Sequence, residues 1–309
     1  MKTLALSFCL FALLATGFAK DDMPVGDLVK KQLDSIGTEQ ARTAVKTRVV
    51  AGAVHFRLLN ASTGGQDGTA TLVSETDKMV SLLKLPNANY HGERFVSDGR
   101  KTQETVVRPG VWSNLGAFVM VHSEILTEGL WGGTLTTAWP LAHLDERHAK
   151  LQDRGLKKID GRELRRVDYS PKKNSDLEIQ LYFEPDTFRH VMTVYSLTIS
   201  PRLGMGEVQT AREQPTRYRL EERFADFKSV DNLILPGRWT IQFTSDATAA
   251  GRDYDAGSFG KGAVGGGAAA TPISTAGVGA GNSPVEEFDV TVADVSHNVS
   301  LDPKNFEVK

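Results

Sequence analysis

Apolar and polar side chains alternate along much of the chain, which is the pattern of strands that bury one face. The clearest example is Ile179, Leu181 and Phe183, which alternate with more polar neighbours and are followed by a proline-containing turn. Residues 191–199 come next and are rich in β-branched side chains, which favour strands. Residues 161–200 are therefore predicted to form three successive antiparallel strands.

The same alternation recurs on both sides of residues 161–200. Between two of the strands, Asp98-Gly99 favours a tight turn because both residues tolerate positive φ. Short connections favour one antiparallel sheet over βαβ units, so we expect a mainly β (α+β) fold with a single, strongly curved sheet of about eleven strands. The other predicted strands lie at 47–61, 69–74, 79–85, 93–97, 101–107, 157–159, 217–228, 234–244 and 285–295.

Helical spacing of apolar residues replaces this alternation at two places. Residues 24–40 predict a short amphipathic helix that ends at Gly37, because glycine commonly terminates helices. Residues 113–128 predict one longer amphipathic helix, since their apolar side chains fall three or four positions apart. A second helical passage follows around Pro140. We therefore expect a helical insertion at 111–158, in the middle of the sheet sequence.

A long antiparallel sheet curls, and a curled sheet with one apolar face inward forms a groove that helices could cover. Two interpretations stay open: the apolar residues line a ligand-binding groove, or they pack against each other and fill the space. The candidate groove residues are Val54, Phe56, Leu58, Ile179, Leu181, Phe183, Trp239, Ile241 and Phe243. The candidate lid residues are Trp112, Leu115, Phe118, Val119, Leu126, Trp131 and Trp139.

The first residues of the chain combine one lysine with an apolar run at 4–18 and small residues before a charged segment. This pattern is typical of a secretory signal peptide (1–19), cleaved after Ala19, and predicts a periplasmic protein. An uncleaved anchor helix is the alternative, although the run is short for a bilayer span. The only cysteine, Cys9, lies in this run, so the mature chain would have no disulfide, thiol nucleophile or thiolate metal site.

The rest of the chain, 20–309, is predicted to form a single domain. Residues 245–283 consist mostly of Gly, Ala, Ser and Thr. Such a segment buries too little apolar surface to offset its ordering entropy, so a flexible loop is predicted there. Because the strand pattern resumes after it, this loop connects two strands of the same sheet.

Charge and motif content give no sign of catalysis or of nucleic-acid binding. The 309 residues carry a formal net charge of -2, which offers no basic footprint for nucleic acid. The histidines lack zinc-site spacing, and no nucleophile elbow or phosphate-binding glycine loop is present. Glu221 and Glu222 cannot form a carboxylate pair, because neighbours on a strand point to opposite faces. We expect no enzyme activity, no catalytic residue, no metal and no cofactor.

Three segments resemble outer-membrane lipoprotein carriers of the LolA/LolB/LppX family. They are the strand and turn Phe95-Val96-Ser97-Asp98-Gly99, the run at 161–196 and the C-terminal pattern at 292–306. The resemblance implies an unclosed half-barrel of about eleven antiparallel strands, lidded by helices. It also implies a periplasmic carrier or sensor that binds the acyl chains of a lipid or lipoprotein in its groove.

The same resemblance implies the partners and one further residue role. A lipid or acylated lipoprotein would be the ligand, and donor or acceptor proteins of the envelope could be partners. Carriers of this family use a strand arginine to latch the lid, for which Arg94 and Arg238 are candidates by residue type. We expect a monomer.

A second class of function is a secreted carbohydrate- or protein-binding β module. In this alternative Trp112, Trp131 and Trp139 would form a platform that stacks on sugars. A sugar platform would expose these rings to water, whereas a lipid carrier would bury them under its lid. The burial of the three rings therefore distinguishes the two hypotheses.

Overall fold

The computed structural model describes residues 23–59, 64–87, 90–110, 112–200, 215–246 and 285–308. The predicted signal peptide lies outside these ranges, as does the predicted loop at 245–283 apart from its first two residues. Among the helices of the described ranges, none is long and apolar enough to cross a membrane.

Twelve strands form one antiparallel sheet in the order β5-β4-β3-β2-β1-β14-β13-β10-β9-β8-β7-β6. Strands β1 and β14 pair in the middle of the sheet, although they are far apart in the sequence. The two edge strands, β5 and β6, do not pair with each other, so the sheet is not closed into a barrel. The bounds are β1 Thr47–Leu58, β2 Gln66–Glu75, β3 Lys78–Lys84, β4 Gly92–Ser97, β5 Thr102–Val106, β6 Lys150–Ile159, β7 Arg162–Ser170, β8 Glu178–Phe183, β9 His190–Ile199, β10 Thr216–Ala225, β13 Arg238–Ser245 and β14 Val285–His297.

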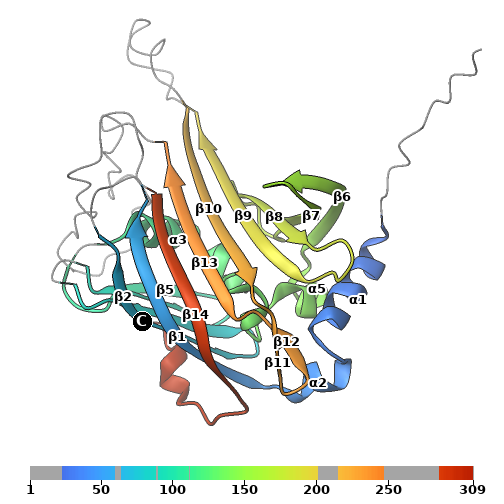
Figure 1. Ribbon diagram of the computed structural model, residues 1–309, viewed down its shortest axis with the longest axis horizontal. Helices are drawn as coiled ribbons and strands as arrows, with labels where there is room; N and C mark the ends of the chain where they lie inside the picture. Colours follow the sequence, from blue (N-terminus) through green and yellow to red (C-terminus); the bar gives the residue numbers. More distant parts are fainter. Residues whose placement is uncertain are drawn as a thin grey trace, which may run out of the picture.

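Helices cover the concave face of this curved sheet (Figure 1). We call residues 112–147 the lid; Figure 1 shows its helices α3 and α5 behind the front strands. Within the lid, α3 lies against β5, α4 against β4 and η1 against β9. The helices are α1 Val25–Ile36, α2 Glu39–Ala44, α3 Asn114–Val121, α4 Glu124–Thr127, η1 Gly133–Leu135, η2 Pro140–His143, α5 Leu144–Arg147 and η4 Pro303–Phe306.

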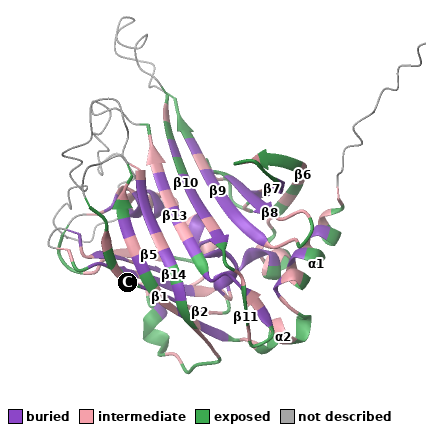
Figure 2. Ribbon diagram, viewed as in Figure 1, coloured by how far each residue is buried: buried purple, intermediate pink, exposed green. Residues whose placement is uncertain are grey.

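Inward and outward positions alternate along the strands, as the sequence predicts. On β10, Tyr218, Leu220 and Phe224 belong to the main core, which lies between the concave face and the lid. Arg217 and Arg219, at the alternate positions, are exposed. Figure 2 shows the same change between buried and exposed residues along the front strands.

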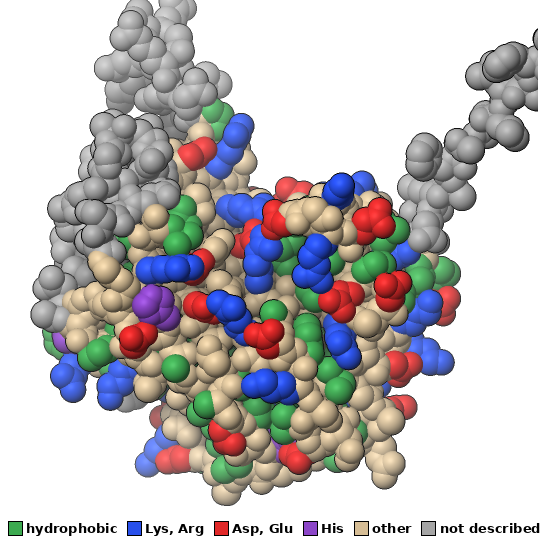
Figure 3. Space-filling model, viewed as in Figure 1, with side chains coloured by type: hydrophobic (Ala, Val, Ile, Leu, Met, Phe, Trp, Pro, Cys, Tyr) green, Lys and Arg blue, Asp and Glu red, His purple; other side chains and the backbone are tan. Residues whose placement is uncertain are grey.

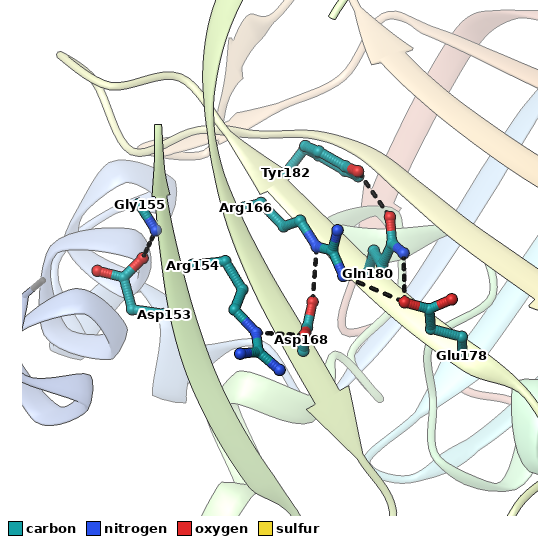
Figure 4. Close-up of polar contacts among 8 residues, drawn as sticks. All are labelled: Asp153, Arg154, Gly155, Arg166, Asp168, Glu178, Gln180 and Tyr182. Atoms are coloured by element: carbon teal, nitrogen blue, oxygen red, sulfur yellow. Dashed lines mark hydrogen bonds and ion pairs between the residues drawn. The ribbon is translucent and has the colours of Figure 1, made fainter. Parts of the chain in front are cut away.

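The outer face of the sheet carries interspersed basic and acidic side chains (Figure 3). Across β6, β7 and β8 these form a hydrogen-bonded ladder (Figure 4). Asp168 accepts hydrogen bonds from Arg154 and Arg166 at 2.6 and 2.7 Å, and Arg166 also donates to Glu178. Further along the outer face, Phe306 of η4 packs with apolar side chains of β3 and β4.

The helical insertion ends earlier than the sequence pattern indicates. We predicted helical structure up to residue 158, but β6 begins at Lys150. This strand is an edge strand, and its sequence KLQDRGLKKI has charged residues where a central strand would have apolar ones. Its register also shifts between Asp153 and Leu156, next to Gly155 at φ 68°.

The predicted helix at 113–128 is two helices instead of one. Ser113 caps α3 by accepting a hydrogen bond from the Gly116 amide, but the helix ends at Val121. His122 has φ -105° and ψ 63°, outside the helical region, and α4 begins two residues later. Gly116 and two valines give α3 a low intrinsic helix propensity.

The predicted strands at 217–228 and 234–244 are separated by a small hairpin, β11 (Lys228–Val230) and β12 (Leu233–Leu235). Asp231 and Asn232 at its turn both have positive φ, 50° and 65°, as a tight hairpin turn requires. Pro236 follows, and because proline has no amide hydrogen it separates this hairpin from β13.

Candidate functional site

The predicted groove and lid residues meet in one apolar core between sheet and lid. From the sheet, eight of the candidate residues are buried in this core, and Leu58 is partly buried against it. The eight are Val54, Phe56, Ile179, Leu181, Phe183, Trp239, Ile241 and Phe243. From the lid, the core contains Leu115, Phe118, Val119, Leu126, Trp131 and Trp139, whereas Trp112 is only half-buried and lies outside it.

Aromatic rings make direct contacts between lid and sheet. The ring of Trp131 meets that of Trp239 edge-on, with 5.4 Å between the centroids. Phe118 lies 5.1 Å from Phe243 by the same measure. Trp139 contacts the ring of His190 on β9 at 4.4 Å. Such pairs contribute beyond the area that they bury, so the closed lid has specific partners on the sheet.

Little space remains between lid and sheet in this closed arrangement. The cavity beside Trp239 and Leu135 measures about 10 Å³, about the limit for one water molecule. A larger cavity of about 230 Å³ lies at the end of the lid, next to α1 and α2. The concave face is thus occupied by the lid's own side chains.

Two buried glutamates of the sheet hold the N-terminus of α3. Glu93 on β4 accepts hydrogen bonds from the Ser113 amide (2.6 Å) and hydroxyl (2.8 Å). Glu286 on β14 accepts from the amides of Asn114 and Leu115, both at 2.9 Å. A side chain at Gly116 would place its Cβ 2.4 Å from Glu93 Oε1, so the close approach requires glycine. Carboxylates are stabilised by the free amides of a helix N-terminus.

A third buried glutamate holds the middle of the lid. Glu222 on β10 accepts a hydrogen bond from the Gly132 amide of the lid at 2.7 Å. It also accepts hydrogen bonds from the Tyr195 hydroxyl (2.8 Å) and from Trp239 Nε1 (2.9 Å). One carboxyl group therefore connects the lid backbone to β9, β10 and β13.

The environment of these glutamates changes their titration. Burial raises the pKa of Glu93 to about 7, and the charge of Glu286 adds to the increase. Burial also raises the pKa of Glu222 to about 7 and that of Glu286 above its ordinary value. The amide and hydroxyl donors oppose these increases, but the loss of water is the larger effect. Glu93 and Glu222 therefore change protonation near neutral pH.

A buried arginine makes the fourth charged contact with the lid. Arg48 on β1 is only 5% exposed, and its Nη1 donates a hydrogen bond to the Thr134 carbonyl at 2.8 Å. Its Nε donates to His297 Nε2 at 3.0 Å. The candidates chosen by residue type lie elsewhere: Arg94 donates to the Asn305 carbonyl, and Arg238 pairs with Asp289. Neither makes a hydrogen bond or ion pair with the lid in the described structure.

The lid contacts of these four charged residues were not predicted from the sequence, although the strand pattern contains a signal for them. Arg48 precedes Val50 and Val54 in the inward-facing positions of β1. Glu222 occupies the next inward-facing position after Leu220 on β10. Glu93 and Glu286 likewise stand two positions from an inward-facing phenylalanine, Phe95 on β4 and Phe288 on β14. A charged residue at an inward-facing position of an otherwise apolar strand face could have identified each of them as a buried polar contact. The prediction that Glu221 and Glu222 face opposite sides is confirmed.

The tryptophan burial counts against a sugar-stacking platform. Trp131 and Trp139 are 0% and 2% exposed, and only Trp112 has partial access to water. Within the described ranges, no group of three or more His, Cys, Asp or Glu side chains is placed to hold a metal ion.

The fold and its site define a class of structure, an open antiparallel half-barrel whose apolar concave face is covered by a helical lid. This is the LolA-like arrangement that the sequence motifs implied. No family model matches the sequence, and no curated protein matches it at a significant level.

Among solved structures, the chain is similar to a LolA superfamily protein from Nitrosomonas europaea, with 12% identity, a TM-score of 0.45 and coverage of 93% of this chain and 98% of that one. It is also similar to a DUF1329 family protein from Desulfovibrio piger, with 10% identity, a TM-score of 0.44 and coverage of 92% and 97%. A further match is the Mycobacterium tuberculosis lipoprotein LppX, with 14% identity, a TM-score of 0.23 and coverage of 56% and 90%.

Proposed function

We propose that this protein binds the acyl chains of a lipid or lipoprotein on the concave face of its sheet, as a periplasmic carrier or sensor that performs no chemistry. The observation that carries the proposal is the lid itself. It covers a continuous apolar face, and four charged side chains of the sheet hydrogen-bond to its backbone. The motif resemblance described above points to the same function.

The buried carboxylates reduce the free-energy cost of opening the lid. Opening exposes apolar surface, which is unfavourable. At the same time it returns Glu93, Glu222 and Glu286 to water, which relieves the desolvation that raises their pKa values. The two effects oppose each other, so the free-energy difference between closed and open states is smaller than for a wholly apolar interface.

An acyl chain can then compensate for the contacts that the lid gives up. Each buried CH₂ group contributes roughly 0.8 kcal/mol, so partial enclosure of one long chain supplies on the order of 10 kcal/mol before entropic costs. The exposed sheet residues would provide a wall of apolar side chains for this purpose. No polar group is needed for the chain itself, in keeping with the absence of catalytic motifs in the sequence.

Native mass spectrometry of the mature protein, purified from its own envelope fraction and followed by organic extraction, tests the proposal. We expect a phospholipid, glycolipid or acylated peptide to co-purify at close to one molecule per chain. A second assay adds a fluorescent fatty acyl probe to delipidated protein, which should bind it. A protein that is empty on purification and takes up no probe would contradict the proposal and would favour a non-lipid binding module.

A further inference from the structure

The cavity of about 230 Å³ has a lining with an unusual charge balance. It lies between α1 and α2, the first residues of β1 and the η1–η2 part of the lid. The lining contains three positive charges, those of Arg42, Lys46 and Arg48, and it includes no Asp or Glu. Five threonines also line the cavity. Apolar side chains such as Leu33 and Trp139 form the rest of the wall.

Arg48 is the buried charge of this cavity. Its two hydrogen bonds go to neutral acceptors, the Thr134 carbonyl and His297 Nε2, and its Nη2 has no partner in the described structure. Because the Arg48 Nε can only donate, His297 must accept at Nε2 and carry its proton on Nδ1, which lies 2.8 Å from Asp231. Burial lowers the pKa of Arg48 to about 10, so the side chain stays charged at neutral pH.

A buried cation without a carboxylate partner is costly. Two carboxylates pair with histidines at this site and not with the arginine. Asp231 contacts His297 and Glu146 contacts His143, and both carboxylates are largely exposed to solvent. Arg42 donates to the Gly37 carbonyl, and Lys46 is exposed to solvent.

We propose that this cavity binds the anionic group of an acyl amphiphile, a phosphate or a carboxylate, with Arg48 as its buried charge partner and Arg42 and Lys46 at its entrance. This inference rests on the proposed lipid-binding function and names the class of ligand. The volume is below the roughly 300–1,000 Å³ of ordinary small-molecule sites, so it suits a charged group and the carbons next to it. Since Arg48 also holds the lid at Thr134, the anion and the lid share one residue.

Titration calorimetry with three probes tests the proposal on the mature protein. The probes are a short-chain lysophosphatidic acid, the monoacylglycerol with the same chain, and inorganic phosphate, the amphiphiles below their micelle concentrations. We expect the lysophosphatidic acid to bind about tenfold or more tightly than the neutral monoacylglycerol, because hydrogen bonds to charged groups are stronger than neutral ones. Inorganic phosphate should bind much more weakly than the lysophosphatidic acid, since it lacks the acyl chain.

Two variants locate the effect. Arg48→Met should remove most of the preference for the charged amphiphile, measured as the ratio of the two affinities, because a looser lid affects the binding of both amphiphiles alike. Because this variant also loosens the lid, Lys46→Gln provides a second test at an exposed position, and it should reduce the preference several-fold. Lys84→Gln, also exposed and far from the cavity lining, is the matched control and should have no effect.

The outcomes separate this inference from the proposed function. Equal affinity for the charged and neutral amphiphiles would overturn the anion site while leaving lipid binding intact. A preference that survives in both Arg48→Met and Lys46→Gln would overturn the assignment to this cavity. Binding of inorganic phosphate alone, without either amphiphile, would identify a free-anion site and would overturn the lipid headgroup assignment and the proposed function together. If none of the three probes binds, both proposals fail.

Discussion

Neighbouring glutamates on the same strand have opposite environments in this protein. On β10, Glu221 faces outward and pairs with Arg219 and Arg223, which are about half exposed. Glu222, the next residue, faces inward and accepts hydrogen bonds only from neutral groups, including the lid amide of Gly132. On β14, Glu287 pairs outward with Arg57, while Glu286 holds the start of α3.

The difference shows that the face of the strand, not the residue type, decides what a charge does here. The outer carboxylates of Glu221 and Glu287 are only 8% and 5% exposed, but each pairs with arginines that are about half exposed, so water solvates these pairs from the arginine side. Inner carboxylates have lost that water and depend on lid amides for hydrogen bonds. The outer charges therefore keep the convex face hydrated, and the inner ones connect the lid to the sheet.

The largest expected effect comes from removing the inner member of the β10 pair. Glu222→Ala leaves the Gly132 amide, the Tyr195 hydroxyl and the Trp239 indole without their acceptor. At roughly 1–3 kcal/mol for each buried unsatisfied group, we expect a loss of about 4 kcal/mol in the free energy of unfolding. Glu221→Ala, the matched outer variant, leaves two half-exposed arginines that water can solvate, so it should cost clearly less, about 1 kcal/mol. Urea unfolding at pH 5 measures both, and similar losses for the two variants would refute the comparison.

Next in size is the pH dependence of the same pair. The pKa of Glu222 rises from 4.5 to about 7 on folding, so the unfolded chain loses this proton first and stability falls as pH rises from about 4.5 to 7. Glu222→Gln removes this dependence. Between pH 5 and pH 8 the free energy of unfolding of the variant should therefore rise by about 3 kcal/mol relative to that of the wild type, at roughly 1.4 kcal/mol per unit of pKa shift. Urea midpoints at several pH values measure the difference.

Comparison with the wild type is needed because other buried groups titrate in this range. Burial lowers the pKa of His190 to about 3, which makes stability rise with pH up to about 6.5 and opposes the glutamates. His190 is present in both proteins, so its contribution cancels in the difference. A Glu222→Gln curve parallel to the wild type would show that Glu222 has an ordinary pKa in the folded protein.

A smaller and more local effect is expected on β14. Glu286→Ala removes the acceptor of the Asn114 and Leu115 amides and should loosen the start of α3 by about 2 kcal/mol. Amide hydrogen exchange at these two residues should accelerate by about 30-fold, while amides of the central strands should change little. Glu287→Ala should leave exchange in the lid unchanged, and acceleration in both variants would argue that the lid has no specific attachment.

The smallest effect is expected in the outer ladder of Figure 4. Arg154→Ala removes one donor to Asp168, which keeps its hydrogen bond from Arg166. We expect a change of at most about 0.5 kcal/mol in the free energy of unfolding, reduced further by salt. A loss above about 2 kcal/mol in thermal or urea unfolding would show that the convex face also contains essential charge pairs.

The sequence predicts the sheet well because alternation is a local signal. The strand pairs on both sides of Asp98-Gly99 and through residues 161–200 lie where the pattern indicates. β6 was largely missed because an edge strand has little apolar alternation, and the end of α3 at Val121 was missed because the apolar spacing continues into α4. Domain limits and the roles of the groove and lid residues stay predictions.

The charged part of the site was harder to predict than the apolar part. Apolar residues such as Trp239 and Phe118 identify themselves by spacing, and both lie in the core. Glu93 and Arg48 are recognisable only once their strand parity and the position of the lid are known together. These side chains bind backbone groups of the lid. Because nearly every residue has the same backbone groups, the sequence does not indicate which residue is the partner.

The most direct test of the account is to lock the lid and measure acyl uptake. The Thr137 amide of the lid donates a hydrogen bond to Ser74 Oγ on β2 at 2.9 Å, so these adjacent positions are chosen for a cysteine pair whose disulfide is verified by titration of free thiols. Cys9 is the only native cysteine, so a chain starting at Lys20 would contain no competing thiol. The outer-face pair Thr240→Cys and Asp289→Cys, which are opposite each other on β13 and β14, is the control.

We predict that the oxidised Ser74→Cys, Thr137→Cys protein takes up no fluorescent acyl probe and that reduction restores uptake, whereas the control pair binds the probe in both states. Equal uptake by the locked and reduced proteins would contradict a function that depends on lid opening.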